Sequence, residues 1–302
     1  MSHEHHHRPD PNLDSGDKRV VMAVAVNFFL TLVQIAAGVI SGSLALIADA
    51  IHNLSDALSL VIAFAARRIG KRPADDRMTF GYGRAEVVAA LVNYTTLIVV
   101  AIYLAAEGIE RLLNPQPVEG WIVVVVAGVA LVVDTVTALL IMRLSKDSAN
   151  MRAAFLHNLA DALGSVAVIV GGALILLYDW RLIDPIVTLM IAGYILWMSW
   201  KGVVPVIRIL MLGAPEGTDL HEVIKALGEM RGVDSVHNVH LWRMQEHESG
   251  LEAHVVLDGQ ENAEKVKQAI KTLLRERFGV AHSVLELEEL GVQSAEEKII
   301  GH

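Results

Sequence analysis

Two octets of one pattern, His52-Asn-Leu-Ser-Asp56-Ala-Leu-Ser59 and His157-Asn-Leu-Ala-Asp161-Ala-Leu-Gly164, decide how the rest of the chain is interpreted. Each places a histidine four positions before an aspartate, and on a helix these two residues lie on one face, one turn apart. Both octets lie in long apolar segments, where a charge costs about 2.5–3.5 kcal/mol and an ionisable residue usually serves a function. Two such helices facing each other would bring two imidazoles and two carboxylates to one point, which is a ligand set for a tetrahedral divalent metal ion.

The composition supports a membrane location for these segments. Of the 302 residues, 53% are hydrophobic and the mean hydropathy is +0.45, which is too apolar for an ordinary soluble domain. A net charge of −9 without a dense basic stripe argues against a nucleic-acid partner. The absence of cysteine excludes disulfides and thiolate ligands.

Six apolar stretches are each long enough to cross a bilayer as a helix, which needs about 20 residues. We therefore predict an α-helical membrane domain over residues 18–212, preceded by a disordered, His-rich tail over residues 1–17. The tail lacks the apolar core of a signal peptide. The six predicted spans are Val20–Ile40, Leu44–Ile69, Ala85–Leu112, Ile122–Met142, Ala153–Leu177 and Ile183–Ile207.

The basic residues predict the orientation of these spans. They precede the first span, flank the second and fourth connections and accompany the exit of the sixth span, whereas Arg111 and Arg181 are the exceptions in the odd-numbered connections. By the positive-inside rule both termini should be cytoplasmic. We expect a multi-pass protein of a bacterial cytoplasmic (inner) membrane. The residues that carry this asymmetry are Lys18, Arg19, Arg67, Arg68, Lys71, Arg72, Arg77, Arg84, Arg143, Lys146, Arg152, Lys201 and Arg208.

A small α+β domain is predicted over residues 213–291, followed by a disordered tail over 292–302. Apolar residues alternate with polar ones in the strands and recur at helical spacing in the helices. The order αββαβ is typical of a ferredoxin-like module. The predicted elements are a helix over Asp219–Met230, strands over Val233–Met244 and Leu251–Leu257, a helix over Asn262–Phe278 and a strand over Val284–Leu290.

The octets and three further motifs together resemble the cation diffusion facilitator family of divalent metal transporters. These motifs are Ser43-Leu-Ala-Leu-Ile-Ala-Asp49, Thr79-Phe-Gly-Tyr-Gly-Arg-Ala-Glu86 and His237-Asn-Val-His240-Leu-Trp242, and the resemblance covers residues 18–290. It implies six transmembrane helices, a cytoplasmic ferredoxin-like domain and a homodimer that exchanges zinc or a related ion from the cytoplasm for protons. The protein is then a transporter and not an enzyme.

The ligand chemistry of His52, Asp56, His157 and Asp161 agrees with zinc transport. Two imidazoles and two carboxylates suit Zn²⁺ and also admit Cd²⁺, Co²⁺ and Ni²⁺, whereas a histidine at position 52 disfavours the harder Mn²⁺. Imidazole binds metal only when neutral, and its ordinary pKa of ~6.5 lets protons compete with the metal. We therefore predict a proton-coupled antiporter with this intramembrane site. Because the two helices run in opposite directions, each histidine should lie level with the aspartate of the other octet.

Other polar residues of the spans have two interpretations each. Asp49 lies close to the face of His52 and could accept a proton or a metal at the mouth of the site, but a helix-end charge in an aqueous vestibule is slightly favoured. Asp134 is more isolated and is interpreted either as support for the ligands or a proton relay, or as a satisfied buried pair.

A second metal site is predicted in the soluble domain. By resemblance, its residues bind zinc at the cytoplasmic dimer interface; the candidates are His237, His254, His282, Glu286 and Glu288. The alternative is that these are ordinary surface residues. Strand alternation places His240 on the opposite face from His237. Some family members bind metal in the connection between spans two and three, but Met78 and Tyr82 replace the histidines here, so we expect no site and interpret Asp75 as a solvated loop charge.

Two other classes of function are compatible with a bound metal. An uncoupled zinc channel or membrane metal sensor would share the site but not the proton coupling. An intramembrane metallohydrolase would need an open coordination position and a general base, as in His-Glu-x-x-His, and this motif is absent from the chain.

Overall fold

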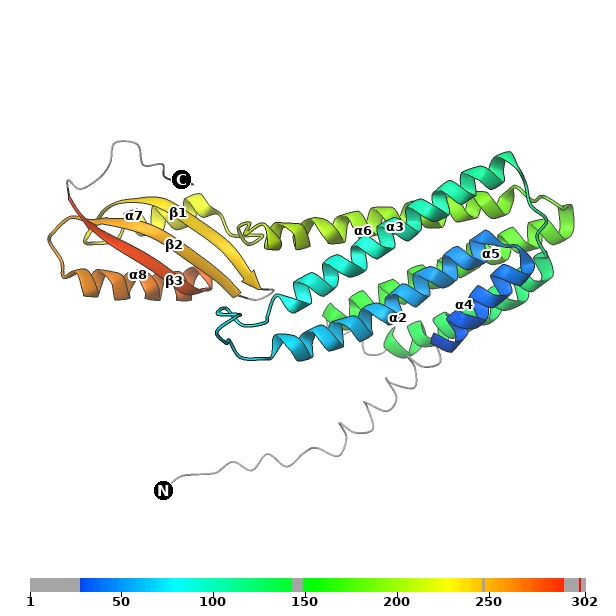
Figure 1. Ribbon diagram of the computed structural model, residues 1–302, viewed down its shortest axis with the longest axis horizontal. Coiled ribbons are helices and arrows are strands. Elements are labelled where there is room, and N and C mark those ends of the chain that lie inside the picture. Colours follow the sequence, from blue (N-terminus) through cyan, green and yellow to red (C-terminus); the bar gives the residue numbers. More distant parts are fainter. Residues whose placement is uncertain (1–27, 143–148, 246–247, 291–298, 300–302) are drawn as a thin grey trace, which may run out of the picture. The chain divides into compact units, whose positions relative to one another are not determined.

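Figure 1 shows a computed structural model of the protein, which describes residues 28–142, 149–245, 248–290 and 299. The chain divides into two compact units. One unit contains the described residues up to Ile62 together with Asn93–Trp200, and the other contains Ala63–Val92 and the described residues from Lys201 onward. Long helices therefore pass from one unit into the other, while the octets both belong to the first unit.

Five helices are long and apolar enough to cross a membrane, by length and composition. Their ends lie within four residues of the predicted ends, which confirms the helical part of the fold. The first predicted span is described only as the helix Phe28–Ser41, and its earlier residues lie outside the described part of the chain. The five helices are α2 (Leu44–Gly70), α3 (Ala85–Leu113), α4 (Gly120–Met142), α5 (Ala149–Tyr178) and α6 (Ile183–Leu210).

One end of the first unit collects the turns between its helices. The turn before α2 contains Gly42, whose φ of +73° belongs to the left-handed region, and a Cβ there would lie 2.7 Å from the Pro117 carbonyl oxygen. Glu119 donates its backbone N–H to the Ser41 carbonyl at 2.8 Å, which joins the turn before α4 to the turn before α2. A glycine at position 42 is therefore required by both backbone conformation and space.

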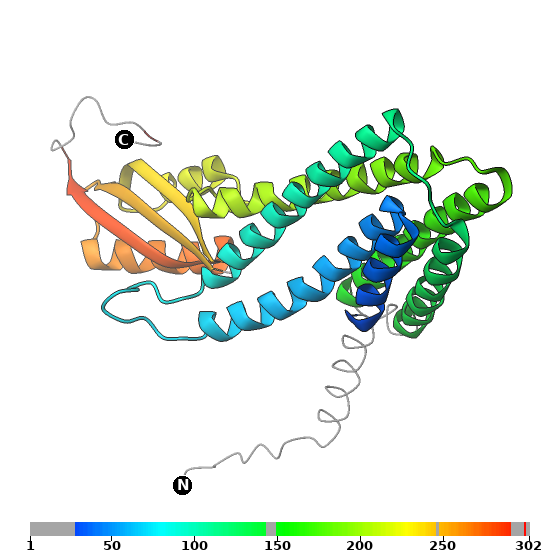
Figure 2. The ribbon, with the colours of Figure 1, turned by 45° about the vertical axis from the view of Figure 1, so that its right-hand side comes forward.

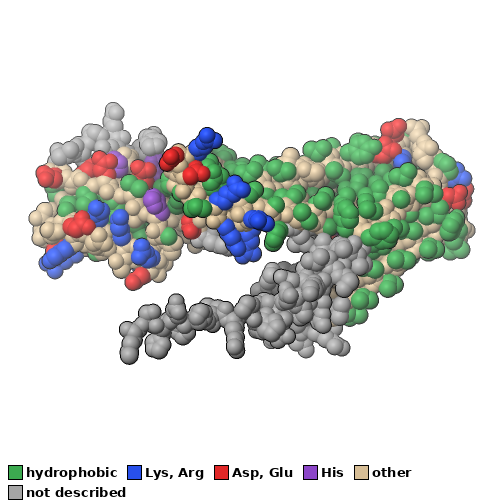
Figure 3. Space-filling model, turned by 60° about the horizontal axis from the view of Figure 1, so that its bottom comes forward, with side chains coloured by type: hydrophobic (Ala, Val, Ile, Leu, Met, Phe, Trp, Pro, Cys, Tyr) green, Lys and Arg blue, Asp and Glu red, His purple; other side chains and the backbone are tan. Residues whose placement is uncertain are grey.

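The core of the first unit is built from small and β-branched side chains. Ala45 and Leu46 of α2 are buried against residues of α4, α5 and α6, namely Val123, Ala127, Val168 and Val187. The outer surface of the helices is apolar, as the green side chains in Figure 3 show. A surface of this kind is suited to lipid rather than water.

The α+β domain has the predicted element order. It consists of α7 (Leu220–Gly228), β1 (Val233–Gln245), β2 (Glu248–Leu257), α8 (Ala263–Phe278) and β3 (Val280–Glu289). The sheet order is β1-β2-β3, with β1 antiparallel and β3 parallel to β2 (Figure 2). Asp219 and Asn262 cap α7 and α8 through side-chain oxygens that accept backbone N–H groups. The ferredoxin-like αββαβ arrangement is thus confirmed.

The third strand starts earlier than predicted. β3 begins at Val280, directly after Gly279, which ends α8 in a left-handed conformation with φ of +66°. This glycine lets the chain turn from helix to strand without a connecting loop. Val280 is buried, but Ala281 and His282 after it are both exposed, so the start of the strand lacks the alternation by which a strand is recognised.

One face of the sheet packs against the two helices of this domain. Val223 and Leu227 of α7 and Ile270 and Leu274 of α8 are fully or nearly fully buried with strand residues such as Val255. The opposite face carries His237 and His254, which are cross-strand partners. The helices therefore leave the histidine face of the sheet to other contacts.

Two regions of the predicted domain plan fall mostly outside the described residues. The N-terminal tail over residues 1–17 lies wholly outside them, and of the C-terminal tail only Ile299 is described. The Ile299 carbonyl accepts the backbone N–H of Val239 in β1 at 3.0 Å. The boundary between residues 212 and 213 stays a prediction.

Candidate metal sites

The two octets meet through His52 on α2 and Asp161 on α5. The His52 side chain is 7% exposed, and its Nε2 lies 3.3 Å from a carboxylate oxygen of Asp161. The predicted pairing of a histidine of one octet with the aspartate of the other is confirmed for these two residues. Because they come from different helices, a bound cation would join α2 to α5 at this point.

The other two predicted ligands are described only by their backbone. Asp56 lies one turn after His52 in α2, and His157 lies one turn before Asp161 in α5. Their side chains are outside the described part of the structure. The helical spacing nevertheless keeps each on the same face of its helix as its described partner.

An aromatic ring of α6 adjoins His52. The rings of Tyr194 and His52 meet edge to face, with their centroids 6.1 Å apart. Trp197 lies one turn further along α6, with its ring centroid 6.2 Å from that of Tyr194. The sequence does not predict a role for Tyr194, because an aromatic residue in an apolar helix carries no signal of its own.

Asp49 and Asp134 lie together. The Ser165 hydroxyl of α5 is placed between them, 3.5 Å from Asp49 and 3.4 Å from Asp134, and the Gln34 amide donates to Asp49 at 3.0 Å. Asp49 is only 4% exposed, so the favoured interpretation of a helix-end charge in an aqueous vestibule is wrong. Asp134 is not isolated either. Two buried carboxylates this close favour a proton or a cation between them.

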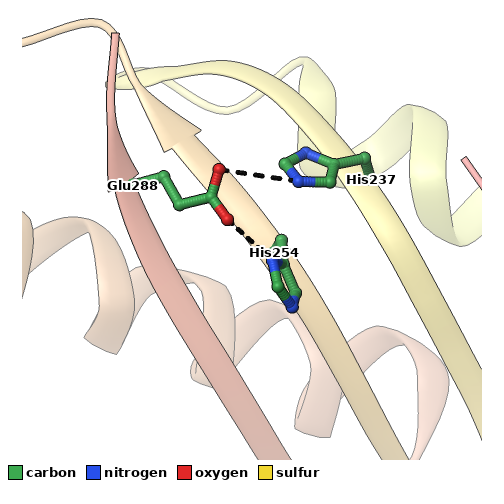
Figure 4. A group of neighbouring side chains, drawn as sticks. All are labelled: His237, His254 and Glu288. Carbon is green, nitrogen blue, oxygen red and sulfur yellow. Dashed lines mark hydrogen bonds and ion pairs between the residues drawn. The ribbon is translucent and has the colours of Figure 1, made fainter. Parts of the chain in front are cut away.

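A second group of candidate ligands lies on the face of the α+β domain's sheet that the helices leave uncovered. His237, His254 and Glu288 come there from three adjacent strands (Figure 4). His237 Nε2 and His254 Nδ1 lie 3.5 Å and 2.6 Å from the two carboxylate oxygens of Glu288. One ligand atom from each residue falls within 4.8 Å of the others. Two imidazoles and a carboxylate at this spacing form three of the four ligands of a tetrahedral zinc site.

Of the two other residues predicted for this group, Glu286 lies beside His254 and His282 lies away from it. A carboxylate oxygen of Glu286 lies 3.5 Å from His254 Nε2, at the rim, with a side chain that is 68% exposed. His282 pairs with Gly250 at the other end of β3 and its ring packs edge to face with Phe80. The inclusion of His282 in this group is therefore wrong, because the parallel register carries it away along the strand.

A bulge in β1 corrects the predicted faces of its two histidines. His237 pairs with His254 and His240 with Glu252, and residues 252 and 254 of β2 share one face. The bulge falls between the two histidines, where Asn238 has a φ of +47°. His237 and His240 therefore lie on the same face of the sheet, since one extra residue cancels the alternation.

The connection between α2 and α3 is organised by Asp75. Its carboxylate accepts the backbone N–H groups of Arg77 and Met78 and the hydroxyl of Tyr82, which lies 2.8 Å away. The Tyr82 hydroxyl, followed by the two backbone donors, lowers the pKa of Asp75. Asp75 is exposed, as predicted, but it orders the loop instead of being merely solvated.

Residues 20–211 match the cation efflux transmembrane domain, and residues 215–290 match the cation efflux protein, cytoplasmic domain. The chain belongs to the cation efflux family, that is, the cation diffusion facilitators. Members of this family are multi-pass membrane transporters of metal cations and not enzymes.

This chain is similar to several curated proteins over nearly its whole length. It is 34% identical to the metal cation efflux system protein CzcD of Cupriavidus metallidurans, over 95% of this chain and 89% of the relative. It is 30% identical to a cadmium, cobalt and zinc/H(+)-K(+) antiporter of Bacillus subtilis, over 95% and 92% of the two chains. It is 32% identical to the zinc transporter ZitB of Escherichia coli, over 95% and 93%.

Proposed function

We propose that this protein is a proton-coupled antiporter that exports divalent metal cations, above all Zn²⁺, from the cytoplasm. The cation binds in a tetrahedral site made of His52, Asp56, His157 and Asp161, within a homodimer in the bacterial cytoplasmic membrane, and both termini are cytoplasmic. The observation that carries the proposal is the buried contact between His52 and Asp161 across two apolar helices. The names of the relatives, which include zinc, cadmium and cobalt, support the choice of ion.

Proton coupling follows from the chemistry of these ligands. A neutral imidazole binds the metal and a protonated one repels it, so a proton and the cation exclude each other at His52. A site that opens to the cytoplasm loads the cation and releases protons. When the same site opens to the outer side, protonation of the imidazoles releases the cation, and the proton gradient thereby drives export.

The ligand assignment is tested by transport in sealed proteoliposomes. His52→Ala and Asp161→Ala each remove one ligand from the site and should abolish zinc transport while the protein stays in the membrane. Asp179→Asn is the matched control, because Asp179 is an exposed carboxylate paired with Arg181 in the turn before α6, and asparagine tolerates its left-handed backbone with φ of +51°. Zinc transport at the wild-type rate by either site variant would refute the assignment.

The alternative of an uncoupled channel or a metal sensor makes a different prediction. A channel would pass zinc without moving protons, and a sensor would bind zinc without passing it. Simultaneous measurement of zinc and proton flux separates all three functions.

We further propose that His237, His254 and Glu288 bind a regulatory zinc ion in the cytoplasmic domain, with Glu286 or a water as the fourth ligand. The support is the spacing of three ligand atoms on three strands. Such an ion would stabilise the folded domain by about 2.7 kcal/mol at a concentration of 100 times its Kd.

This regulatory site is tested in the full-length His52→Ala protein, in which the transport site is disabled. Zinc should raise the thermal unfolding midpoint, and the additional change His254→Ala or Glu288→Ala should remove that rise. Glu276→Ala is the control, because Glu276 is exposed on α8, which packs on the opposite face of the sheet. An unchanged zinc response in both site variants would disprove the proposal.

A further inference from the structure

Asp184, at the start of α6, is a buried carboxylate that is not one of the ligands of the proposed transport site. It is 2% exposed and accepts the Ser43 hydroxyl at 2.5 Å, the Leu44 backbone N–H at 2.8 Å and the Ala45 backbone N–H at 3.4 Å. All three donors belong to the start of α2. Asp184 therefore caps a helix that lies 140 residues earlier in the chain.

The first N–H groups of any helix lack partners within that helix, and a carboxylate near them is stabilising. In α2 this need is met from two sources. The Ser43 hydroxyl oxygen accepts the Leu46 backbone N–H at 3.1 Å, as a local cap does, and the same hydroxyl donates to Asp184. The cap of α2 is thus completed only when α6 is in place.

The two helices start at the same end of the unit and run side by side in the same direction. Ala48 of α2 and Ala192 of α6 are both fully buried in one cluster, so small side chains let the two helices approach closely. Nine residues after Ser43 comes His52, and ten residues after Asp184 comes Tyr194. At 1.5 Å per residue these steps are about 14 Å and 15 Å, so the cap and the contact between the Tyr194 and His52 rings fit one register of the two helices.

A second side chain, Arg111, fixes the turn before α2. Arg111 of α3 donates from Nη1 to the Gly42 carbonyl at 2.6 Å and from Nε to Glu107 at 2.9 Å. The start of α2 is thereby fixed by two helices, while its ligand-bearing part extends away from this anchor.

We propose that Asp184 is a positioning residue for metal transport. By capping α2 from α6, it fixes the position of α2 along the axis of α6, and this position sets the distance between His52 and Asp161. This inference rests on the proposed role of His52 as a ligand. Metal sites tolerate displacements of only about 0.2 Å in ligand distance, so a shift of α2 along its axis weakens binding of the transported cation.

The test is zinc transport by the full-length protein in proteoliposomes, with KM and kcat measured separately. Asp184→Ala should raise KM for zinc at least tenfold with a smaller change in kcat. Asp184→Asn, which keeps one accepting oxygen, should restore part of the affinity. Tyr194→Ala should raise KM several-fold and Tyr194→Phe should raise it less, because phenylalanine keeps the ring that contacts His52. Asp179→Asn, five residues before Asp184 and exposed, should match the wild type, because asparagine tolerates the left-handed backbone of this position.

Ser43→Ala keeps the test valid if Asp184→Ala does not fold. It removes one donor to Asp184, leaves both backbone donors, and should raise KM two- to threefold. A wild-type KM in Asp184→Ala, or in both Asp184→Asn and Ser43→Ala, overturns the inference, as does a fall in kcat alone. Normal transport by His52→Ala, in contrast, would overturn the proposed transport site, whatever the Asp184 variants do.

Discussion

At the scale of single residues, the contact between His52 and Asp161 defines the chemistry. An imidazole and a carboxylate from different helices, buried together in an apolar unit, are costly unless they are paired or bind a cation. In the proposed transport site, histidine in place of aspartate at position 52 would make the ligand set softer and would favour zinc over harder ions.

The residue at position 52 should therefore control selectivity. His52→Asp replaces one imidazole by a carboxylate and should lower the ratio of zinc to manganese transport at least tenfold, because oxygen ligands suit Mn²⁺. Competition between the two ions in proteoliposomes measures this ratio. An unchanged ratio would mean that position 52 does not contact the transported ion.

The sequence predicts some of the residues around this site and not others. A histidine and an aspartate at helical spacing, repeated on two antiparallel spans, predict the pairing of His52 with Asp161. The cap that Asp184 supplies to α2 depends on the packing of α6 beside α2, and the only local signal is Asp184-Pro185 at a helix start. Unlike the repeated octets, this contact between distant segments leaves no spacing pattern within either segment.

At the scale of elements, the turn before α2 needs Gly42. Gly42→Ala places a Cβ against the Pro117 carbonyl in a left-handed backbone and should destabilise the protein by about 1–3 kcal/mol. The matched control is Gly128→Ala in α4, where a Cβ would meet nothing within 4 Å and helix propensity improves by about 1 kcal/mol. Thermal unfolding in detergent compares the two, and equal midpoints would contradict this account of the turn.

The bulge in β1 determines which face of the sheet His240 lies on. It places His240 on the same face as the cytoplasmic cluster, that is, His237, His254 and Glu288. Asn238 adopts a left-handed conformation there, which asparagine and glycine tolerate and β-branched residues do not.

Asn238→Val should consequently destabilise the protein by about 1–2 kcal/mol and weaken zinc binding at the cytoplasmic cluster, because the strand straightens or strains. Asn238→Gly should behave as wild type. Chemical unfolding with and without zinc, in the His52→Ala background, measures both effects. A tolerated valine would show that the bulge does not constrain the site.

The sequence predicts the membrane-crossing helices well because their apolar stretches are long. The sequence does not predict the bulge in β1, since a single extra residue in a strand changes the faces of its side chains without changing the composition. The sequence does not predict the early start of β3 either, because the two residues after Val280 are both exposed and do not alternate. Both errors affect the cytoplasmic domain, where elements are short.

At the scale of the whole molecule, the distribution of basic residues predicts that both termini lie in the cytoplasm. The connection between α3 and α4 should then face outward and the connection between α2 and α3 inward. Because the chain has no cysteine, single cysteines report on each side without a background.

Gln116→Cys, in the exposed turn before α4, should react in intact cells with a maleimide that does not cross membranes. Asp76→Cys, in the exposed connection after α2, should react only after the membrane is permeabilised. The opposite labelling pattern would reverse the proposed orientation and with it the direction of transport.

The most direct test of the central claim is the flux of zinc and protons measured together in sealed proteoliposomes, with a metal dye and a pH dye in the lumen. Zinc entry should be accompanied by proton exit, and both should vanish in His52→Ala. Zinc entry without any proton movement, or equal fluxes in wild type and His52→Ala, would contradict a proton-coupled antiporter that works through this site.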